Sequence, residues 1–284
     1  GLSPQAAFTL LTASRALKLT DEVTPGHWMV GELGASVLGN PAVADMVRHH
    51  AVLYRDLADP LAILRHRENT GLRNYWSYVP GGTRLEESHR EYSRLMSSSL
   101  ALIADHILDS YPLKDYASLI DVAGGTGQFA RVVKQRYPEL STTVLDLPEV
   151  VSEAKALSTP HDIRFVATDM FHSPLPENSE LFSLIRVLHD HDDEPVKQLL
   201  SRLHSALRPG GHLLIAEPMT GTAGAESIGD TYFSFYLWAM GSGRPRTAKE
   251  LEAMCLAAGF TRIREFKTPI PALTRLLVAE KSPG

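Results

Sequence analysis

The sequence has almost no cysteine and no strong charge of either sign. Cys255 is the single cysteine among 284 residues, so the chain cannot form an internal disulfide, which suits a reducing compartment. It lies in the helix-like run TAKELEAMCLAAGF with no paired metal or redox motif beside it, which indicates a buried core thiol. The formal net charge of −5 provides no broad basic field. Nucleic acid and anionic membranes are therefore not expected as partners.

Long hydrophobic runs are also absent. No apolar stretch reaches the ~18 residues that a membrane-spanning helix needs, and no signal-like segment opens the chain. We therefore expect a cytoplasmic protein, not inserted in a membrane, that acts on a small molecule. The chain starts GLSPQ, without methionine and inside a helix-like pattern, so we expect that an upstream segment is missing.

The N-terminal part predicts a small, mostly helical region. Residues 3–19 begin with a Ser-Pro pair, a helix N-cap followed by proline at the first helical position. Residues 20–33 indicate a turn-rich pair of short strands, and a helix followed by such a wing is the outline of a winged helix. The low basic charge argues against DNA binding. Residues 41–68 and 85–110 have the periodicity of further helices.

From residue 118 onward, short apolar runs alternate with helical ones, as in a mostly parallel sheet with helices on both faces. The last two apolar runs, TRIREFKTP and LTRLLVAEK, are joined by very few residues. A parallel crossover needs about a dozen or more, so these two strands must be antiparallel neighbours. We expect an N-terminal region at 1–112 and an α/β domain at 113–284.

The segment DVAGGTGQFA fits the G-x-G-x-x-G/A fingerprint of loops that bind adenosine cofactors. Gly124, Gly125 and Gly127 allow the backbone to approach a ligand without a Cβ clash. Asp146, at the end of the second predicted strand, can bind a ribose diol. These features suit a nicotinamide cofactor and S-adenosylmethionine equally well.

Two further acids distinguish these cofactors. Asp121 lies directly before the glycines, where a carboxylate would repel a pyrophosphate but attract a cationic ammonium or sulfonium. Asp169, in VATDMF, ends the third strand, where an adenine amino group could be bound. Each aspartate taken singly also fits an ordinary strand-end turn. Together, three carboxylates at successive strand ends favour a cofactor without phosphate.

Five segments, DVAGGTG, LDLP, TDMF, RVLHDHDDE and LRPGGHLLIAEPM, resemble in order and spacing the S-adenosylmethionine-dependent small-molecule O-methyltransferases of the acetylserotonin and caffeic acid type. The segment GDTYFSFYLWAMGSGRPRT is most similar to bacterial hydroxyneurosporene methyltransferases. The resemblance covers nearly the whole chain, with the family's N-terminal dimerisation helices largely absent. It implies a class I methyltransferase fold with an antiparallel last strand, behind a truncated winged-helix-like region, and a homodimer.

The resemblance also implies which residues bind S-adenosylmethionine. Ala123 stands where many members have the first glycine of the loop, which matters only if the backbone there needs a positive φ. The expected cofactor-binding residues are the loop residues and the acids with their neighbours: Asp121, Ala123, Gly124, Gly125, Gly127, Asp146, Leu147, Asp169, Met170 and Arg186.

Methyl transfer from a sulfonium needs the acceptor, methyl carbon and sulfur in line, and a base for the acceptor's proton. His189 ends the fourth strand, at the edge where open α/β sheets bind ligands, and matches the family's catalytic histidine. Glu217 ends the next strand and is expected to accept the other imidazole N–H. Plant members have a further Glu in GKERT, where this chain has Pro245 in GRPRT. His191 stands where a tryptophan is usual.

The run HDHDD at 189–193 also resembles a metal cluster. It has no distant ligand pair, and methyl displacement needs no Lewis acid, so no metal is expected. Aromatic side chains crowd the segment 232–240, which indicates an apolar pocket for the acceptor, although core packing is the alternative for each of them. The candidate substrate residues are Tyr78, Met96, Phe233, Tyr236, Trp238 and Met240.

The leading hypothesis is an O-methyltransferase acting on a hydroxyl of a hydrophobic secondary metabolite, with His189 as general base. An N- or C-methyl acceptor, or the tertiary hydroxyl of a carotenoid, stays open on the same scaffold. Two hypotheses of other classes are a nicotinamide oxidoreductase and a non-catalytic ligand-binding protein.

Overall fold

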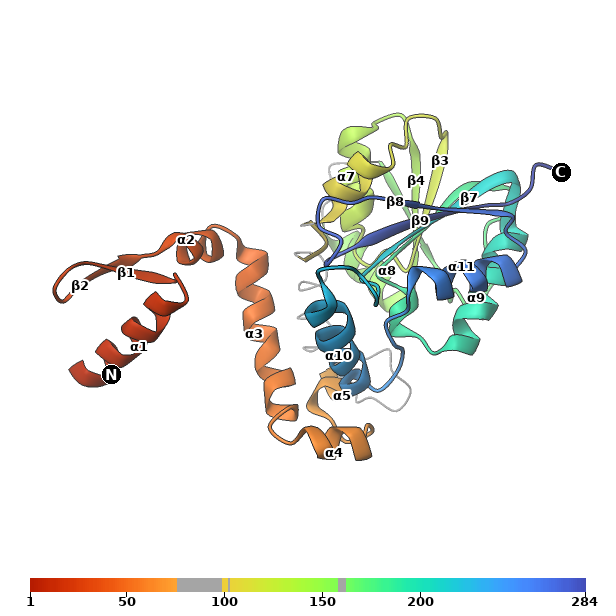
Figure 1. Cartoon of the computed structure of the whole chain (residues 1–284). Helices are drawn as coiled ribbons and strands as arrows, with labels where there is room; N and C mark the ends of the chain where they lie inside the picture. The colour runs from red at the N-terminus through yellow and green to blue at the C-terminus, as the bar shows by residue number, and fades with distance from the viewer. Residues whose placement is uncertain (76–98, 102, 158–161) are drawn as a thin grey trace. The chain divides into compact units, whose positions relative to one another are not determined.

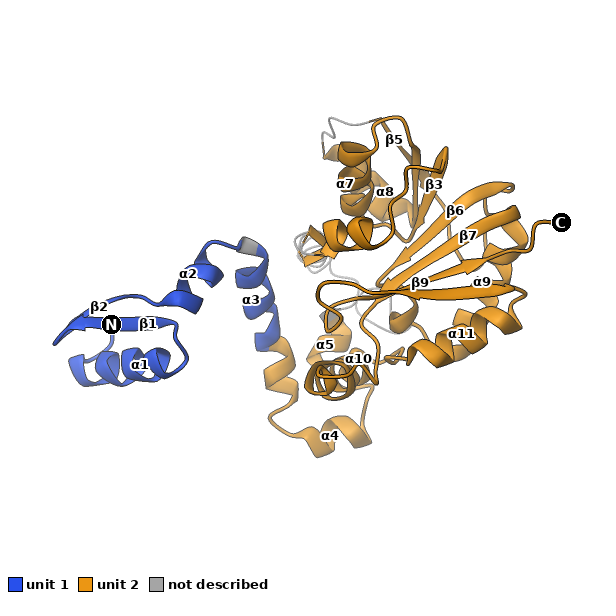
Figure 2. Cartoon of the chain, turned by 45° about the horizontal axis from the view of Figure 1, so that its top comes forward, with its two compact units in different colours: residues 1–51 blue, residues 52–284 orange. Residues whose placement is uncertain are grey.

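The computed structural model describes residues 1–75, 99–101, 103–157 and 162–284. Tyr78 and Met96, two candidate substrate residues, lie outside the described residues. The chain divides into two compact units, residues 1–51 and 52–284 (Figure 2). The domain boundary expected between residues 112 and 113 is a different division, between the helical region and the α/β domain, and it stays a prediction.

The first unit contains two helices, a hairpin and the start of a third helix. Ser3 accepts a hydrogen bond from the backbone N–H of Ala6, and the helix α1 begins there, as predicted. The two predicted short strands pair antiparallel. The elements are α1 (Pro4–Ala16), β1 (Thr20–Thr24), β2 (His27–Val30), α2 (Glu32–Leu38) and α3 (Pro41–Asp56), which crosses the boundary.

The second unit begins with short helices that pack together with α10 (Phe233–Met240). Asp59 caps α4 (Pro60–Arg65) through the N–H of Ala62. The carboxylate of Asp56 accepts the first two N–H groups of α5 (Gly71–Tyr75). Apolar side chains of α4, α5 and α10, together with Leu53 of α3, form one buried cluster: Leu53, Ile63, Leu72, Tyr236, Leu237, Ala239 and Met240. Residues 103–110 form another helical segment.

A seven-stranded sheet forms the body of the second unit (Figure 1). Its strands have the order β5-β4-β3-β6-β7-β9-β8. The strands from β5 to β7 pair parallel, whereas β9 runs antiparallel to both of its neighbours. The predicted antiparallel last strand is therefore confirmed. The strands are β3 (Ser118–Val122), β4 (Ser141–Asp146), β5 (Ile163–Ala167), β6 (Ser179–Ile185), β7 (Leu207–Glu217), β8 (Arg262–Phe266) and β9 (Arg275–Glu280).

Each face of the sheet has its own hydrophobic core, because successive strand residues point to opposite faces. Along β7, Leu213 and Ile215 belong to one core, while Leu214 and Ala216 belong to the other. Cys255 is fully buried in the first core, which confirms the predicted core thiol, and burial raises its pKa to about 12. The helices of this body are α7 (Gln128–Arg136), α8 (Pro148–Ala156), α9 (Asp193–Ala206) and α11 (Ala248–Ala257).

The parallel register brings the carboxyl ends of four strands to one edge of the sheet. Asp121 lies near the end of β3, Asp146 ends β4, and Glu217 ends β7. The segment that follows β6 contains His189. Residues from four separate stretches of sequence therefore meet where open α/β sheets bind ligands. Among the described helices, none is both long and apolar enough for a membrane span.

Candidate functional site

The loop between β3 and α7 has a backbone in the left-handed region at three positions. Gly125 and Gly127 have φ of 60° and 84°, and Ala123 has φ of 53°. An alanine in this region costs roughly 1–2 kcal/mol relative to right-handed backbone. From the sequence, alanine in place of the family's glycine is expected to matter only if the backbone needs a positive φ here. The backbone does need one, so the replacement matters at Ala123. Strain of this kind is commonly retained at ligand sites.

The three glycines of the loop differ in what surrounds them. A Cβ on Gly124 would lie 2.5 Å from Oδ2 of Asp121, and one on Gly127 would lie 2.9 Å from the ring of Phe165. These two glycines therefore let the loop pack closely on the strands. A Cβ on Gly125 would meet nothing within 4 Å. The open side of the loop, where a ligand can approach, is at Gly125.

Asp146 fastens this loop to the end of β4. Its Oδ2 accepts the backbone N–H of Gly125 at 2.7 Å, and its Oδ1 accepts that of Leu147 at 2.7 Å. Burial raises the pKa of Asp146 to about 6. Each carboxylate oxygen has a second lone pair, so Asp146 can also accept from a ribose diol placed beside Gly125.

Asp121 lies behind the loop instead of at its open side. Its side chain is 1% exposed, and its Oδ1 accepts the hydroxyl of Ser183 at 2.6 Å. Within the described part of the chain, Oδ2 has no hydrogen-bond partner. Burial raises the pKa of Asp121 to about 7, and the neighbouring charge of Asp146 adds to this. Asp121 is therefore placed to attract a cationic ligand electrostatically across the glycine loop. The direct contact with the ligand that the sequence led us to expect is less favoured by this geometry.

Asp169 uses both carboxylate oxygens within its own turn. Oδ1 accepts the backbone N–H of Phe171 and Oδ2 pairs with Nδ1 of His172, both at 2.8 Å. Burial alone would raise the pKa of Asp169, but these partners lower it. Met170 packs against the core of α9. The expected adenine contacts of Asp169 and Met170 stay predictions.

Arg186 is the second strained residue of the site, with φ of 59°. Its backbone N–H bonds the carbonyl of Ala216 at 2.7 Å, which continues the pairing of β6 with β7. Its Nη1 donates to the hydroxyl of Ser99 at 2.9 Å. The side chain is therefore directed to the residues before the helical segment 103–110, and its expected cofactor contact stays a prediction.

His189 lies in a short 3₁₀ turn, Leu188–Asp190, directly after β6, and only 7% of its side chain is exposed. Its Nε2 lies 3.1 Å from Oδ1 of Asp190, and its Nδ1 lies 3.9 Å from Oε2 of Glu217. Glu217 is fully buried, and the same Oε2 accepts the backbone N–H of His189 at 3.2 Å. The expected imidazole–Glu217 hydrogen bond is thus replaced by one to the histidine backbone.

The two carboxylates decide the protonation of His189. Burial lowers the pKa of a histidine, but Asp190 and Glu217 outweigh it and raise the pKa of His189. Burial also raises the pKa of Glu217. An imidazolium at this position is flanked by a carboxylate near each ring nitrogen. Asp190 was not identified from the sequence as a partner of the imidazole. Its position directly after His189 in the sequence was the signal that could have indicated it.

The aromatic candidates of α10 lie in different environments. The ring of Phe233 lies 6.3 Å from the ring of His189, and Tyr232 packs on Phe233 at 4.9 Å. Trp238 instead donates its indole N–H to the carbonyl of Ile63, with the guanidinium of Arg67 over its ring. Tyr236 and Met240 are 7% and 1% exposed in the cluster with α4 and α5. Phe233 is the described candidate whose ring neighbours the base.

The acids after His189 have partners other than a metal. Asp193 pairs with Arg244 and Arg246, and Asp192 accepts the backbone N–H of Gly243. Among the described residues, no three His, Cys, Asp or Glu side chains are grouped to hold a metal ion.

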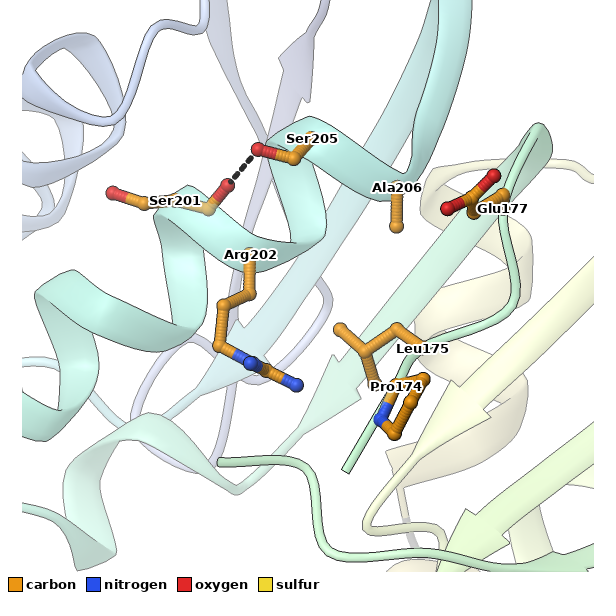
Figure 3. Close-up of a pocket in the computed structure, with 7 residues that line it drawn as sticks. All are labelled: Pro174, Leu175, Glu177, Ser201, Arg202, Ser205 and Ala206. Carbon is orange, nitrogen blue, oxygen red and sulfur yellow. Dashed lines mark hydrogen bonds between the residues drawn. The ribbon is translucent and has the colours of Figure 1, made fainter. Parts of the chain in front are cut away.

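A hollow of about 370 Å³ lies away from this site, beside the C-terminal end of α9 and the segment that leads into β6 (Figure 3). Arg202 on its wall donates to the carbonyls of Met170 and Ser173. The hollow is at the opposite edge of the sheet from His189, because residues 174–177 precede the start of β6. It takes no part in the site described above.

Comparisons with known proteins agree on one class. A family model described as an O-methyltransferase domain matches residues 54–261. Demethylspheroidene O-methyltransferase of Rhodobacter capsulatus is 41% identical over 283 residues, or 99% of this chain and 71% of that protein. Acetylserotonin O-methyltransferase of Mus musculus is 34% identical over 64% of this chain and 49% of that protein.

Solved structures agree with the sequence relatives. The crystal structure of human N-acetylserotonin methyltransferase in complex with S-adenosylmethionine has a TM-score of 0.83 to this chain. It is 26% identical and covers 99% of this chain and 84% of that one. PigF with S-adenosylhomocysteine has a TM-score of 0.76 at 20% identity, covering 98% and 85%, which is a likeness of fold.

We expect S-adenosylmethionine to bind more tightly as the pH rises from 5.5 to 8, by on the order of tenfold. The raised pKa values of Asp121 and Asp146 mean that both acids hold protons below pH 6–7. A sulfonium cation favours their ionised forms, so binding at low pH must release protons. Calorimetry in buffers of different ionisation enthalpy measures this release.

S-adenosylhomocysteine is the matched control, because it lacks the sulfonium charge. Its affinity should change with pH much less than that of S-adenosylmethionine. Equal pH dependence of the two ligands would contradict a role of the buried carboxylates in attracting the sulfonium.

Proposed function

Since this chain belongs to the S-adenosylmethionine-dependent O-methyltransferase family and acts on a small molecule, we propose that it methylates a hydroxyl of a hydrophobic secondary metabolite, with His189 as general base. Family membership excludes the nicotinamide oxidoreductase and the non-catalytic binding protein. The O-methyltransferase relatives also favour oxygen over nitrogen or carbon as the acceptor atom.

The observation that carries the proposal is the environment of His189. Its ring is almost fully buried at the ligand-binding edge of the sheet, with Asp190 and Glu217 beside it and Phe233 next to its ring. A base in this position takes the proton of the acceptor hydroxyl as the oxygen is methylated. The two carboxylates then stabilise the imidazolium that forms. Glu217 acts on the backbone as well, because it holds the N–H of His189.

Three features of the glycine loop support it as the place where the cofactor binds. The loop is open at Gly125, Asp146 lies at its edge, and Asp121 supplies a buried negative charge beneath it. We propose that S-adenosylmethionine lies there, with its ribose on Asp146, and that it supplies the methyl group as a sulfonium. Ala123, Gly124 and Gly127 shape the loop. Leu147, Asp169, Met170 and Arg186 are the further proposed contacts.

The acceptor is proposed from the relatives and the aromatic row. The chain is 41% and 39% identical to two demethylspheroidene O-methyltransferases, and it covers about seven tenths of each. From His189, the rings of Phe233 and Tyr232 follow one another at 6.3 and 4.9 Å, and the row ends at the buried ring of Tyr236, 5.6 Å from Tyr232. Such a row suits an extended apolar molecule. We propose a hydroxylated carotenoid, whose tertiary alcohol is a weak acid and depends strongly on positioning.

We also propose a homodimer formed through the first unit. Helix α1 has no buried residue, and large apolar side chains of this unit are exposed in the single chain. An apolar surface of this kind indicates a protein interface. The exposed side chains include Phe8, Leu10, Leu17, Val23, Met29, Val30, Leu33 and Leu38.

His189→Ala should lower kcat by about 100-fold or more, because the general base is lost. The affinity for S-adenosylhomocysteine should stay within about threefold, since His189 is not proposed as a cofactor ligand. Asp146→Ala should have the opposite pattern: it should weaken the binding of the cofactor more than it lowers kcat. Turnover with labelled cofactor and calorimetry measure the two quantities. An unchanged kcat of His189→Ala would rule out this residue as the base.

The acceptor is tested by offering demethylspheroidene and N-acetylserotonin side by side, with labelled S-adenosylmethionine. We expect the carotenoid to gain one methyl group, read by mass spectrometry, at a rate at least about tenfold above that of N-acetylserotonin. Preferential methylation of N-acetylserotonin would contradict the carotenoid proposal and leave the O-methyltransferase assignment intact.

Analytical ultracentrifugation should give twice the chain mass of 31.2 kDa at micromolar concentration. Replacing Phe8 and Met29 by Ser should shift the equilibrium to monomer, because both side chains are exposed on the first unit. Lys249→Ser, an exposed change on α11, is the control and should leave the dimer intact. A monomeric parent chain would overturn the dimer proposal.

A further inference from the structure

The segment GSGRPR, residues 241–246, packs directly on the turn that carries His189. Gly243 has φ of 74°, and a Cβ on it would overlap the carbonyl oxygen of His189. Its backbone N–H donates to Asp192 at 3.0 Å, and the hydroxyl of Ser242 donates to the carbonyl of Asp190 at 2.8 Å. We call residues 241–246 the clasp. Its contacts with the turn involve residues 188–193.

Arg246 is the centre of the clasp and is fully buried. Its Nη1 donates to the carbonyl of Leu188 at 2.8 Å, and its Nη2 donates to the carbonyl of His191 at 2.7 Å. Nε and Nη2 also bind Oδ1 of Asp193, at 3.0 and 2.7 Å. The guanidinium therefore binds the backbone on both sides of His189 and the first residue of α9. A lysine has one nitrogen and cannot make this set of bonds.

The charge of Arg246 also bears on the second carboxylate of the site. Glu217 is influenced by His189, Arg246 and Asp190, and the positive charge of Arg246 works against the rise in the pKa of Glu217 that burial causes. His189 in turn is influenced by Asp190, Glu217 and Arg186. If Arg246 loses its charge, Glu217 takes up a proton more readily, and His189 loses part of the negative charge that stabilises its imidazolium.

We propose that Arg246 is a positioning residue for the methyl transfer: it holds the turn of His189 in place through the carbonyls of Leu188 and His191, without touching either reactant. This inference rests on the proposed role of His189 as general base. Family members with GKERT place a glutamate in this segment, whereas this chain has the buried Pro245. Arg246 stands where GKERT also has its arginine, so the segment acts on the base through this arginine without the glutamate.

Arg246→Met tests the proposal. We expect kcat to fall at least about tenfold, while the affinity for S-adenosylhomocysteine stays within about threefold. The pKa of His189 should fall, measured by NMR of ¹³C-labelled imidazoles with His189→Ala used to assign the signal. Arg246→Lys retains the charge, so it should leave the pKa near the parent value and restore only part of kcat.

Arg244→Met is the matched control. Arg244 binds the same Asp193 and also Glu250, but it donates to no carbonyl of the turn among the described residues. It should leave kcat within about threefold and the titration of His189 unchanged. Gly243→Ala is the complementary change, because its methyl group displaces the carbonyl of His189 without altering any charge. It should lower kcat while the pKa of His189 stays near that of the parent.

If Arg246→Met does not fold, Arg246→Lys and Gly243→Ala decide the question by the same two measurements. The proposal is overturned if kcat of the Arg246 variants falls no further than that of Arg244→Met. It is also overturned if the titration of His189 is the same in folded Arg246→Met as in the parent. Retained activity of His189→Ala would instead refute the base. The NMR titration needs no acceptor, so it separates these two failures.

Discussion

Glu217 is the group on which the arrangement of the catalytic half of the site, the surroundings of His189, depends. A fully buried carboxylate is costly unless neighbouring donors and charges compensate it. Here the compensation comes from the backbone N–H of His189, the imidazole itself and the buried guanidinium of Arg246. The bond that Glu217 accepts from the backbone N–H and the bonds from Arg246 to the carbonyls of Leu188 and His191 also place the histidine. Stability of this edge of the sheet and orientation of the base are thus consequences of one set of interactions.

The cofactor half of the site, the glycine loop with Asp121 and Asp146, also contains buried carboxylates, but fewer groups of the chain stabilise them. Asp121 keeps one oxygen without a partner in the described part of the chain, and Ala123 holds a left-handed backbone. Both features cost free energy within the chain itself. Both also face the loop where a positively charged ligand is proposed. Among the described residues, Glu217 also keeps one oxygen, Oε1, without a hydrogen-bond partner. The two acids differ in the charges near them, because His189 and Arg246 act on Glu217 as cations, whereas Asp121 has a second acid, Asp146, beside it. The environment of Asp121 is therefore the one that a cationic ligand completes.

Much of this could be predicted from sequence, because it depends on local patterns. The short connection between the last two strands required β8 and β9 to pair antiparallel, and the apolar alternation predicted the parallel strands before them. His189, Asp146 and Glu217 were placed at strand ends, which parallel topology gathers at one edge. The details that were missed depend on side-chain direction. Glu217 binds the backbone of His189, Asp190 takes the imidazole, and Trp238 and Met240 pack on α4 and α5.

The sequence by itself determined the order of the strands and helices, the chemistry available at each strand end and the family. These follow from periodicity, turn length and residue type, all of which act over short distances along the chain. Only the tertiary structure decided which donor each buried carboxylate accepts, and it alone revealed that Arg246 reaches both sides of His189. Such partners are separated by up to 62 residues in the chain. Their pairing is decided by the competition among nearby groups for hydrogen bonds once water is excluded.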